Sequence, residues 1–224
     1  MYKGLVIFDL DGTLIDTIED LGTAVNFVLE STGRPTHPVE DYRFMVGNGI
    51  RKLVQRALPE HEKEDETLPD RLLPGFKRYY LEHIYEHSRP YPGVAELLRK
   101  LQDEGYALAV ASNKFQEGTS VLVNHFFPDI NFVAVCGGCD ERPLKPDPAV
   151  LEDIMRLSSV PAERTVMVGD SGTDIQTARN ASVRSIGVCW GFRPDAARSA
   201  DAFVHSTAEL AEAICFIGSN RHRV

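Results

Sequence analysis

The residues with the clearest chemical potential stand near the start of the chain. An apolar run begins at residue 5, and Asp9 and Asp11 follow it with one residue between them. Side chains alternate along a strand, so the two acids would share one side, until Gly12 breaks the strand and lets the chain turn. Two carboxylates a few ångströms apart raise each other's pKa unless a cation lies between them. A divalent metal ion is the simplest such cation, and one site could then use both acids.

Three more groups of polar residues follow apolar runs farther along the chain. Ser112 and Asn113 bring a hydroxyl, an amide and backbone N–H groups to the start of a predicted helix, which suits an anionic oxygen, although helix capping is the ordinary role of such residues. Lys145 has prolines close by on both sides, which stiffen the backbone and could hold its ammonium group as a charge clamp. Asp170 ends another apolar run and Asp174 begins a helix, so both could approach a divalent cation.

These acids and the lysine fit a reaction at phosphorus. A carboxylate at the end of a strand can attack an electrophile, and Asp9 is the candidate nucleophile. Asp11 would protonate the leaving group and then deprotonate the attacking water, which requires an environment different from that of Asp9. Thr13 offers a hydroxyl to fix one of the two acids, or it is only a turn residue. With Lys145 and Mg²⁺ neutralising charge on the transferred group, the set suits phosphoryl transfer.

The spacing of apolar residues predicts the elements that bring these side chains together. Short apolar runs predict β-strands at residues 5–9, 107–112, 132–136, 165–169, 185–190 and, more weakly, 202–205. Apolar residues between these runs recur at helical spacing. Continuous rather than alternating apolar strands indicate a parallel sheet with helices on both faces. The prediction is an α/β fold with a doubly wound parallel sheet, in which ligands bind outside the carboxyl ends of the strands, where all four polar groups fall.

One long interval contains no predicted strand. Between residue 16 and about residue 86 the pattern is helical, with apolar stripes that predict four helices. The prolines and the glycine at residues 90–93 suit a hinge where the chain returns. We therefore expect an α/β core domain formed by residues 1–15 and 87–224, and an inserted α-helical cap formed by residues 16–86.

Composition limits the classes of function. The chain of 224 residues has 43% hydrophobic and 25% charged residues, which is ordinary for a globular protein. No segment approaches the roughly 20 apolar residues that span a bilayer, so we expect no membrane insertion. The net charge of -9 argues against a nucleic-acid partner. Asp9 comes too early for the apolar region of a signal peptide, which favours a cytoplasmic location; a monomer and a homodimer both stay open.

A pair of cysteines offers a competing metal or redox motif. Cys136 and Cys139 have the spacing of a zinc knuckle or a redox pair. A zinc knuckle needs a second pair of ligands, and none follows at suitable spacing. Cys136 also ends a predicted buried strand, so we interpret both thiols as structural or incidental.

In their order along the chain, the polar groups resemble the motifs of the haloacid dehalogenase (HAD) superfamily, in the branch with a helical cap after the first strand. The resemblance covers nearly the whole chain, and the ordered set is more specific than any single motif. The matching residues, from the first motif to the fourth, are Asp-Leu-Asp-Gly-Thr at 9–13, Ser112-Asn113, Lys145, and Gly-Asp-Ser-Gly-Thr-Asp at 169–174.

The resemblance also implies roles for individual residues. It implies that Asp9 is the phosphorylated nucleophile, that Asp11 is the acid and base, and that Ser112 and Lys145 bind phosphate. It further implies that Asp9, the backbone carbonyl of Asp11, and Asp170 hold Mg²⁺, with Asp174 in support. The second acid, at position 11, favours phosphatases over dehalogenases.

Within the family the chain resembles the phosphoglycolate phosphatases, which implies that the partner is a small phosphorylated metabolite. The similar segments are residues 112–114, the hinge at 90–93 and the cap segment Val-Gly-Asn-Gly at 46–49. Gly47 and Gly49 would let the cap backbone approach the substrate. Asn48, Arg51 or Lys52 could meet a carboxylate, although a polar helix face explains the two cations equally well. The expected substrate-binding residues are therefore Thr13, Ser112, Asn113, Asn48, Gly49 and Arg51.

Other functions use the same motifs. A β-phosphoglucomutase-like enzyme would return the phosphoryl group to a sugar, and a pyrophosphatase or a nucleotidase of the same branch also stays open. From a different class, a signalling domain could accept phosphate on Asp9 without turnover. The long helical insert and Asp11 argue against that alternative, because a passive acceptor would use neither.

Overall fold

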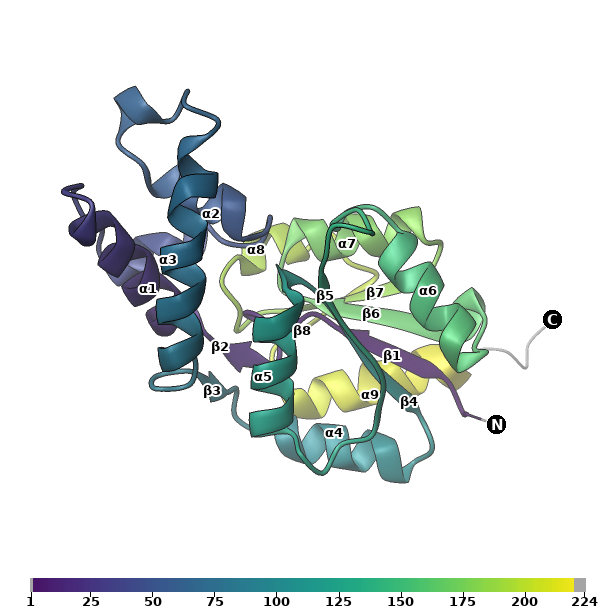
Figure 1. Ribbon diagram of the computed structural model, residues 1–224. Helices are drawn as coiled ribbons and strands as arrows, with labels where there is room; N and C mark the ends of the chain where they lie inside the picture. Colours follow the sequence, from purple (N-terminus) through teal and green to yellow (C-terminus); the bar gives the residue numbers. More distant parts are fainter. Residues whose placement is uncertain (1, 220–224) are drawn as a thin grey trace.

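A parallel β-sheet forms the centre of the computed structural model, which describes residues 2–219 (Figure 1). Within these residues the sheet has six strands in the order β5-β4-β1-β6-β7-β8, and every neighbouring pair is parallel. The strands are β1 Leu5–Phe8, β4 Ala107–Phe115, β5 Phe132–Gly138, β6 Thr165–Gly169, β7 Arg184–Val188 and β8 Ala202–Val204. The predicted α/β fold class is confirmed, with small differences at the strand ends.

Helices cover both faces of the sheet, as the continuous apolar strands predicted. Val6 and Phe8 of β1 belong to the same buried cluster as residues of α4 (Val94–Asp103), α5 (Gln116–Phe126) and α9 (Thr207–Ser219). Leu5 and Ile7 point to the other face and pack in a cluster with residues of α6 (Ala149–Ser158) and α7 (Gly172–Asn180). A strand buried on both faces can be apolar throughout, which is why β1 shows no alternation.

The order of the strands places a crevice at the end of β1. The chain passes from β1 to β4 and β5 on one side, and then crosses to β6, β7 and β8 on the other side. Ligands bind outside the carboxyl ends of the strands at such a reversal, because the connections on the two sides lead away from each other.

The long interval without core strands folds into a helical segment beside the sheet (Figure 1). Within the described residues it contains three α-helices rather than the four predicted: α1 Ile18–Ser31, α2 Ile50–Ala57 and α3 Leu68–His83. Two short 3-10 helices, η1 Val39–Phe44 and η2 Glu60–Glu62, each follow a proline. The helices enclose their own apolar residues, among them the fully buried Tyr42, Phe76 and Tyr80.

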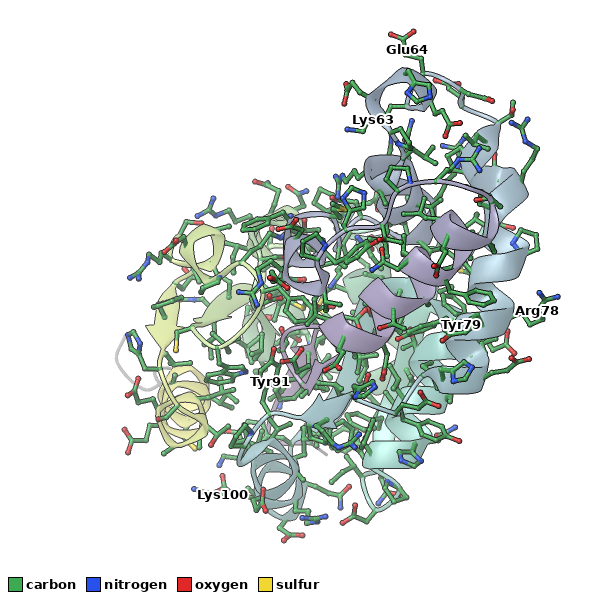
Figure 2. The ribbon with its side chains drawn as sticks, turned by 90° about the vertical axis from the view of Figure 1, so that its left-hand side faces the viewer. Lys63, Glu64, Arg78, Tyr79, Tyr91 and Lys100 are labelled. Carbon is green, nitrogen blue, oxygen red and sulfur yellow. The ribbon has the colours of Figure 1, made fainter. Side chains whose placement is uncertain are left out.

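Two short strands join the helical segment to the sheet. β2 (Ile15–Asp16) and β3 (Arg89–Pro90) pair antiparallel where the chain leaves and returns. Asp20, in the first turn of α1, accepts hydrogen bonds from the backbone N–H of Ser88 at 2.8 Å and from its hydroxyl at 2.6 Å. Strands of two residues carry no periodic signal, so the sequence indicated only a hinge here. Figure 2 shows Tyr91 near this junction and Lys63 and Glu64 at the far tip of the helical segment.

None of the helices within residues 2–219 has the length and apolar character that crossing a membrane requires.

Candidate active site

Asp9 lies at the carboxyl end of β1, in the middle of the sheet. Its backbone N–H donates to the carbonyl of Val168 on β6 at 2.9 Å, so the parallel pairing continues up to this residue. β1 pairs with β4 on one side and with β6 on the other. Residues near the ends of β4 and β6 therefore lie beside Asp9, and this is why motifs far apart in the sequence meet here.

The turn after β1 brings Asp170 close to the chain. Gly12 has a φ of +86°, which favours glycine, and a Cβ atom at this position would lie only 2.6 Å from Oδ2 of Asp170. The hydroxyl of Thr13 lies 3.5 Å from Oδ1 of the same residue. Thr13 was expected to fix Asp9 or Asp11, but the structure directs its hydroxyl to Asp170 instead.

Lys145 is the buried cation of the site. Its ammonium group donates to Oδ1 of Asp9 at 2.8 Å and to Oδ1 of Asp174 at 2.7 Å. The third donor goes to the carbonyl of Ala111 at 2.7 Å. An ammonium group has three protons, so every donor is used. The side chain is only 3% exposed, and these contacts fix a positive charge directly beside Asp9.

Three carboxylates share this positive charge. Oxygen atoms of Asp9, Asp170 and Asp174 lie within 4.8 Å of one another, and all three residues are buried. Burial raises the pKa of Asp9 to about 8. The charge of Lys145 works to lower this pKa, and the neighbouring acids raise it further. Burial likewise raises the pKa of Asp170 to about 6, with Asp174 adding to the rise. One lysine does not balance three acids, so the cluster has the charge and the oxygen donors that suit a divalent cation.

Backbone and hydroxyl groups orient the other two acids. Oδ2 of Asp170 accepts hydrogen bonds from the backbone N–H of Phe192 at 2.7 Å and of Arg193 at 3.4 Å. Oδ2 of Asp174 accepts from the backbone N–H and the hydroxyl of Ser171, at 3.1 and 2.6 Å, in a capping box that begins α7. Asp174 therefore directs its other oxygen to Lys145 while it caps a helix.

The carboxylate of Asp11 lines the same pocket but has other partners. The ammonium of Lys114 lies 3.0 and 3.2 Å from its two oxygens, and the hydroxyl of Thr17 donates to Oδ1 at 2.7 Å. The Lys114 side chain is 1% exposed, and its ammonium lies 4.6 Å from the centre of the Tyr80 ring on α3. Sequence reasoning assigned Lys114 no role, because its contact with Asp11 joins residues from distant parts of the chain.

Asn113 connects Lys145 to the helical segment. Its Oδ1 accepts from the backbone N–H of Lys145 at 2.8 Å, and its Nδ2 donates to the carbonyls of Lys145 and Gly47 at 2.9 and 3.0 Å. Asn113 lines the pocket, but both N–H donors of its amide bind backbone carbonyls, so its contact with substrate stays a prediction. Ser112 does line the pocket, where its Oγ accepts from the N–H of Lys114 at 3.2 Å.

Two glycines of the helical segment reach the pocket, but two expected polar side chains do not. Gly47 and Gly49 line it with φ angles of +103° and +82°. Oδ1 of Asn48 accepts a hydrogen bond from Arg56 at 2.8 Å instead. Arg51 is 43% exposed and pairs with a carboxylate of α3 at 2.8 Å. The geometry therefore does not bring Asn48 and Arg51 to the site, and for Arg51 the polar helix face explains its position.

The pocket lies between the strand ends and the helical segment and encloses about 50 Å³. The acids and lysines described above line one part of it, and apolar residues of the helical segment line another: Leu21, Val46, Ile50 and Leu53. Phe192 and Arg193 complete the lining, and sequence reasoning missed both. They follow β7 in a Gly-Phe-Arg run whose composition carries no specific signal for a site.

Residues 6–188 match the family model of the haloacid dehalogenase-like hydrolases. The match includes all four motifs and every acid and lysine of the site. The chain belongs to this family. The resemblance stated from the sequence motifs is thereby confirmed, and so is the expectation that this HAD-like hydrolase is an enzyme.

Individual relatives of this HAD-like hydrolase carry a more specific name. A phosphoglycolate phosphatase of Pseudomonas syringae pv. tomato is 40% identical over 191 residues, which cover 84% of this chain and 70% of the relative. A phosphoglycolate phosphatase of Mesorhizobium japonicum is 36% identical and covers 95% of this chain and 96% of the relative. The crystal structure of a candidate phosphoglycolate phosphatase from Lactobacillus delbrueckii subsp. bulgaricus has a TM-score of 0.86 at 34% identity, covering 96% and 99% of the two chains.

Proposed function

We propose that this HAD-like hydrolase releases phosphate from 2-phosphoglycolate through an aspartyl-phosphate intermediate. The observation that carries the proposal is the ion pair between Lys145 and Asp9 inside a cluster of three buried acids. The names of the two curated relatives support the substrate. The pocket volume of about 50 Å³ also favours a small ester.

Asp9 is the proposed nucleophile. One carboxylate oxygen attacks phosphorus, the bond between phosphorus and the ester oxygen breaks, and the phosphoryl group is left on Asp9. Lys145 holds Oδ1 at 2.8 Å, which leaves Oδ2 as the attacking atom. The same ammonium balances negative charge on the transferred group, because it is fixed beside Asp9 before the reaction begins.

Asp11 is the proposed acid and base. It gives a proton to the ester oxygen as glycolate leaves, and it then takes a proton from the water that hydrolyses the phosphorylated Asp9. Asp11 lines the same pocket as Asp9, and Lys114 and Thr17 bind its carboxylate oxygens. Its environment differs from that of Asp9, as two separate roles require.

The acid cluster supports Mg²⁺ as the cofactor. It offers only oxygen donors, and the single lysine leaves it with excess negative charge. Bound Mg²⁺ would neutralise charge on the phosphoryl oxygens. Asp9, Asp170 and the backbone carbonyl of Asp11 are the proposed ligands. Asp174 supports them, because its two oxygens already bind Lys145 and Ser171.

Residues 16–86 are the proposed cap, and residues 1–15 and 87–224 the proposed core. The cap supplies Gly47, Gly49 and an apolar wall to the pocket. Opening of such a cap admits substrate, and closing excludes bulk water from the site. The cytoplasmic location and the monomeric or homodimeric state expected from the sequence belong to the same proposal.

Phosphate release from a small panel of substrates tests the function. The panel contains 2-phosphoglycolate, a hexose phosphate, pyrophosphate and AMP, each assayed with Mg²⁺ and with excess EDTA. We expect the highest kcat/KM with 2-phosphoglycolate, equimolar glycolate as product, and no turnover in EDTA. Asp9→Asn should abolish turnover while circular dichroism and the melting temperature stay close to wild type. Isomerisation of the sugar phosphate without phosphate release, or a faster reaction with pyrophosphate or AMP, would contradict the proposal.

A further inference from the structure

Among the residues that the structure describes, one cation of the pocket has a side chain that pairs with no carboxylate. Lys114 and Lys145 each donate to carboxylates of the site. Arg193, in the loop between β7 and α8 (Pro194–Ala197), lines the same pocket. Within the described residues its guanidinium makes no hydrogen bond or ion pair, and its charge acts on Asp170 only at longer range. A guanidinium that faces a pocket with its donors unused can bind an anionic ligand.

Two contacts place Arg193 where the helical segment meets the strand ends. Its backbone N–H donates to Oδ2 of Asp170 at 3.4 Å, which ties its main chain to the acid cluster. Its guanidinium lies against Gly47, where an added Cβ atom would overlap Nη2 and lie 3.3 Å from Cζ. Gly47 therefore provides the space that the Arg193 side chain occupies.

A second guanidinium approaches from the helical segment. Arg56 on α2 donates to the carbonyl of Met45 at 2.6 Å and to Oδ1 of Asn48 at 2.8 Å, so it holds the loop that carries Gly47. Burial lowers the pKa of Arg56, and the charge of Arg193 lowers it further. Among the described residues neither arginine forms an ion pair with a carboxylate. Two like charges held near each other repel, and an anion bound at Arg193 would offset that repulsion.

We propose that Arg193 binds the carboxylate of the substrate, and that this contact selects small phosphate esters bearing an acid group close to the phosphorylated carbon. The inference rests on the proposed function, because it requires the phosphoryl group to lie at Asp9. The planar guanidinium presents two parallel N–H donors that match a carboxylate, and Arg56 adds positive charge without touching the ligand. Arg193 thus takes the role that the sequence suggested for Asn48, Arg51 or Lys52.

Kinetics with a matched pair of substrates tests this specificity. Ethyl phosphate resembles 2-phosphoglycolate but has a methyl group in place of the carboxylate. For Arg193→Met we expect kcat/KM to fall about 10- to 100-fold with 2-phosphoglycolate and to stay within about twofold with ethyl phosphate. Inhibition by inorganic phosphate should also stay within twofold. Arg193→Lys, which keeps the charge but loses the two parallel donors, should lie between the two.

A neighbouring arginine supplies the control. Arg198 directly follows α8, is 63% exposed and pairs with Asp195 of that helix. It does not line the pocket, so Arg198→Met removes a charge nearby without changing the lining. It should leave the substrate preference unchanged. Equal losses on both esters in Arg193→Met, or no loss on either, would overturn the assignment. Arg193→Lys reports on the same preference if the methionine variant does not fold.

The wild-type enzyme separates this inference from the proposed function. If wild type shows no preference for 2-phosphoglycolate over ethyl phosphate, both the proposed substrate and the role of Arg193 are contradicted. If wild type prefers 2-phosphoglycolate and Arg193→Met keeps that preference, only the role of Arg193 is contradicted.

Discussion

Without a divalent cation, this protein should lose stability as the pH rises from 6 to 8. Burial raises the pKa of Asp9 to about 8, although the charge of Lys145 lowers it, and the charge of Asp174 adds to the rise. Burial also raises the pKa of Asp170, to about 6. In the unfolded chain both carboxyls titrate near pH 4. At these two carboxyls the folded protein therefore binds more protons than the unfolded chain between about pH 4 and pH 8. Their contribution to the free energy of unfolding falls with rising pH across this window.

The size of the effect follows from the number of protons. A difference of one bound proton changes the free energy of unfolding by about 1.4 kcal/mol per pH unit. Between pH 6 and pH 8 the folded state keeps most of one proton on Asp9, and the unfolded chain keeps almost none. We expect the metal-free protein to be about 2 kcal/mol less stable at pH 8 than at pH 6 from this group. Mg²⁺ favours ionised ligands, so its stabilising effect should grow over the same range.

Urea unfolding measures this difference directly. Trp190 is the chain's one tryptophan, and its indole N–H donates to the carbonyl of Thr13 at 3.1 Å, so its fluorescence reports on the region of the site. The titrations are run at pH 6 and pH 8, in EDTA and in excess Mg²⁺. Asp9→Asn is the control, because it keeps the shape of the side chain and removes its titration.

The comparison between the two proteins isolates Asp9. Histidines and other titrating groups are common to wild type and Asp9→Asn, so their contributions cancel in the difference. In EDTA the loss of stability from pH 6 to pH 8 should be about 2 kcal/mol smaller in Asp9→Asn than in wild type. The same pH dependence in both proteins would show that Asp9 is already ionised at pH 6, and the reasoning from burial would fail.

Three further results are expected. Lys114→Met should lower kcat about tenfold or more with every phosphate ester, because Asp11 loses the cation that orients it; steady-state rates within twofold of wild type would contradict this role. Arg51→Ala should leave kcat/KM for 2-phosphoglycolate within twofold of wild type, because the side chain lies outside the pocket. A loss of kcat/KM with this ester alone would show that Arg51 does contact the substrate. Asn113→Ala should lower the free energy of unfolding, measured in urea, by about 1–3 kcal/mol, because it removes both backbone partners of Lys145. A change below about 0.5 kcal/mol would refute that reading.

The elements of the core could be predicted because local patterns determine them. The run Leu5–Phe8 is apolar throughout, which predicts a central parallel strand, and the structure buries it on both faces. Asp9, Asp170 and Asp174 stand directly after such runs or at the start of a helix, and strand ends in this topology meet at one edge. Their convergence follows from chain order and strand direction, without knowledge of any side-chain contact.

The remaining residues of the site depend on contacts that no local pattern encodes. Lys114, on β4, reaches Asp11 in the turn after the neighbouring strand β1, and its contact with the Tyr80 ring depends on how α3 packs against the core. Arg193 approaches Gly47 only because the helical segment folds back over the strand ends. The sequence suggested that Arg51, which follows the glycine loop, could meet a carboxylate of the substrate. The orientation of α2 then turned it toward α3, which a helical pattern alone does not specify.

The contacts of the pocket divide into those within the core and those that need the helical segment. Lys145 meets Asp9 and Asp174 entirely within the core, so this charge cluster persists when the proposed cap opens. The bond from Asn113 to Gly47 and the approach of Arg193 to the same loop join the proposed core to the proposed cap. In the proposed scheme phosphate binding would precede closure, and a carboxylate bound at Arg193 would lie beside the Gly47 loop and stabilise the closed cap. An ester without the carboxylate would reach the same Asp9 but would stabilise the closed state less. The enzyme would then distinguish the two esters at cap closure, the step that excludes water.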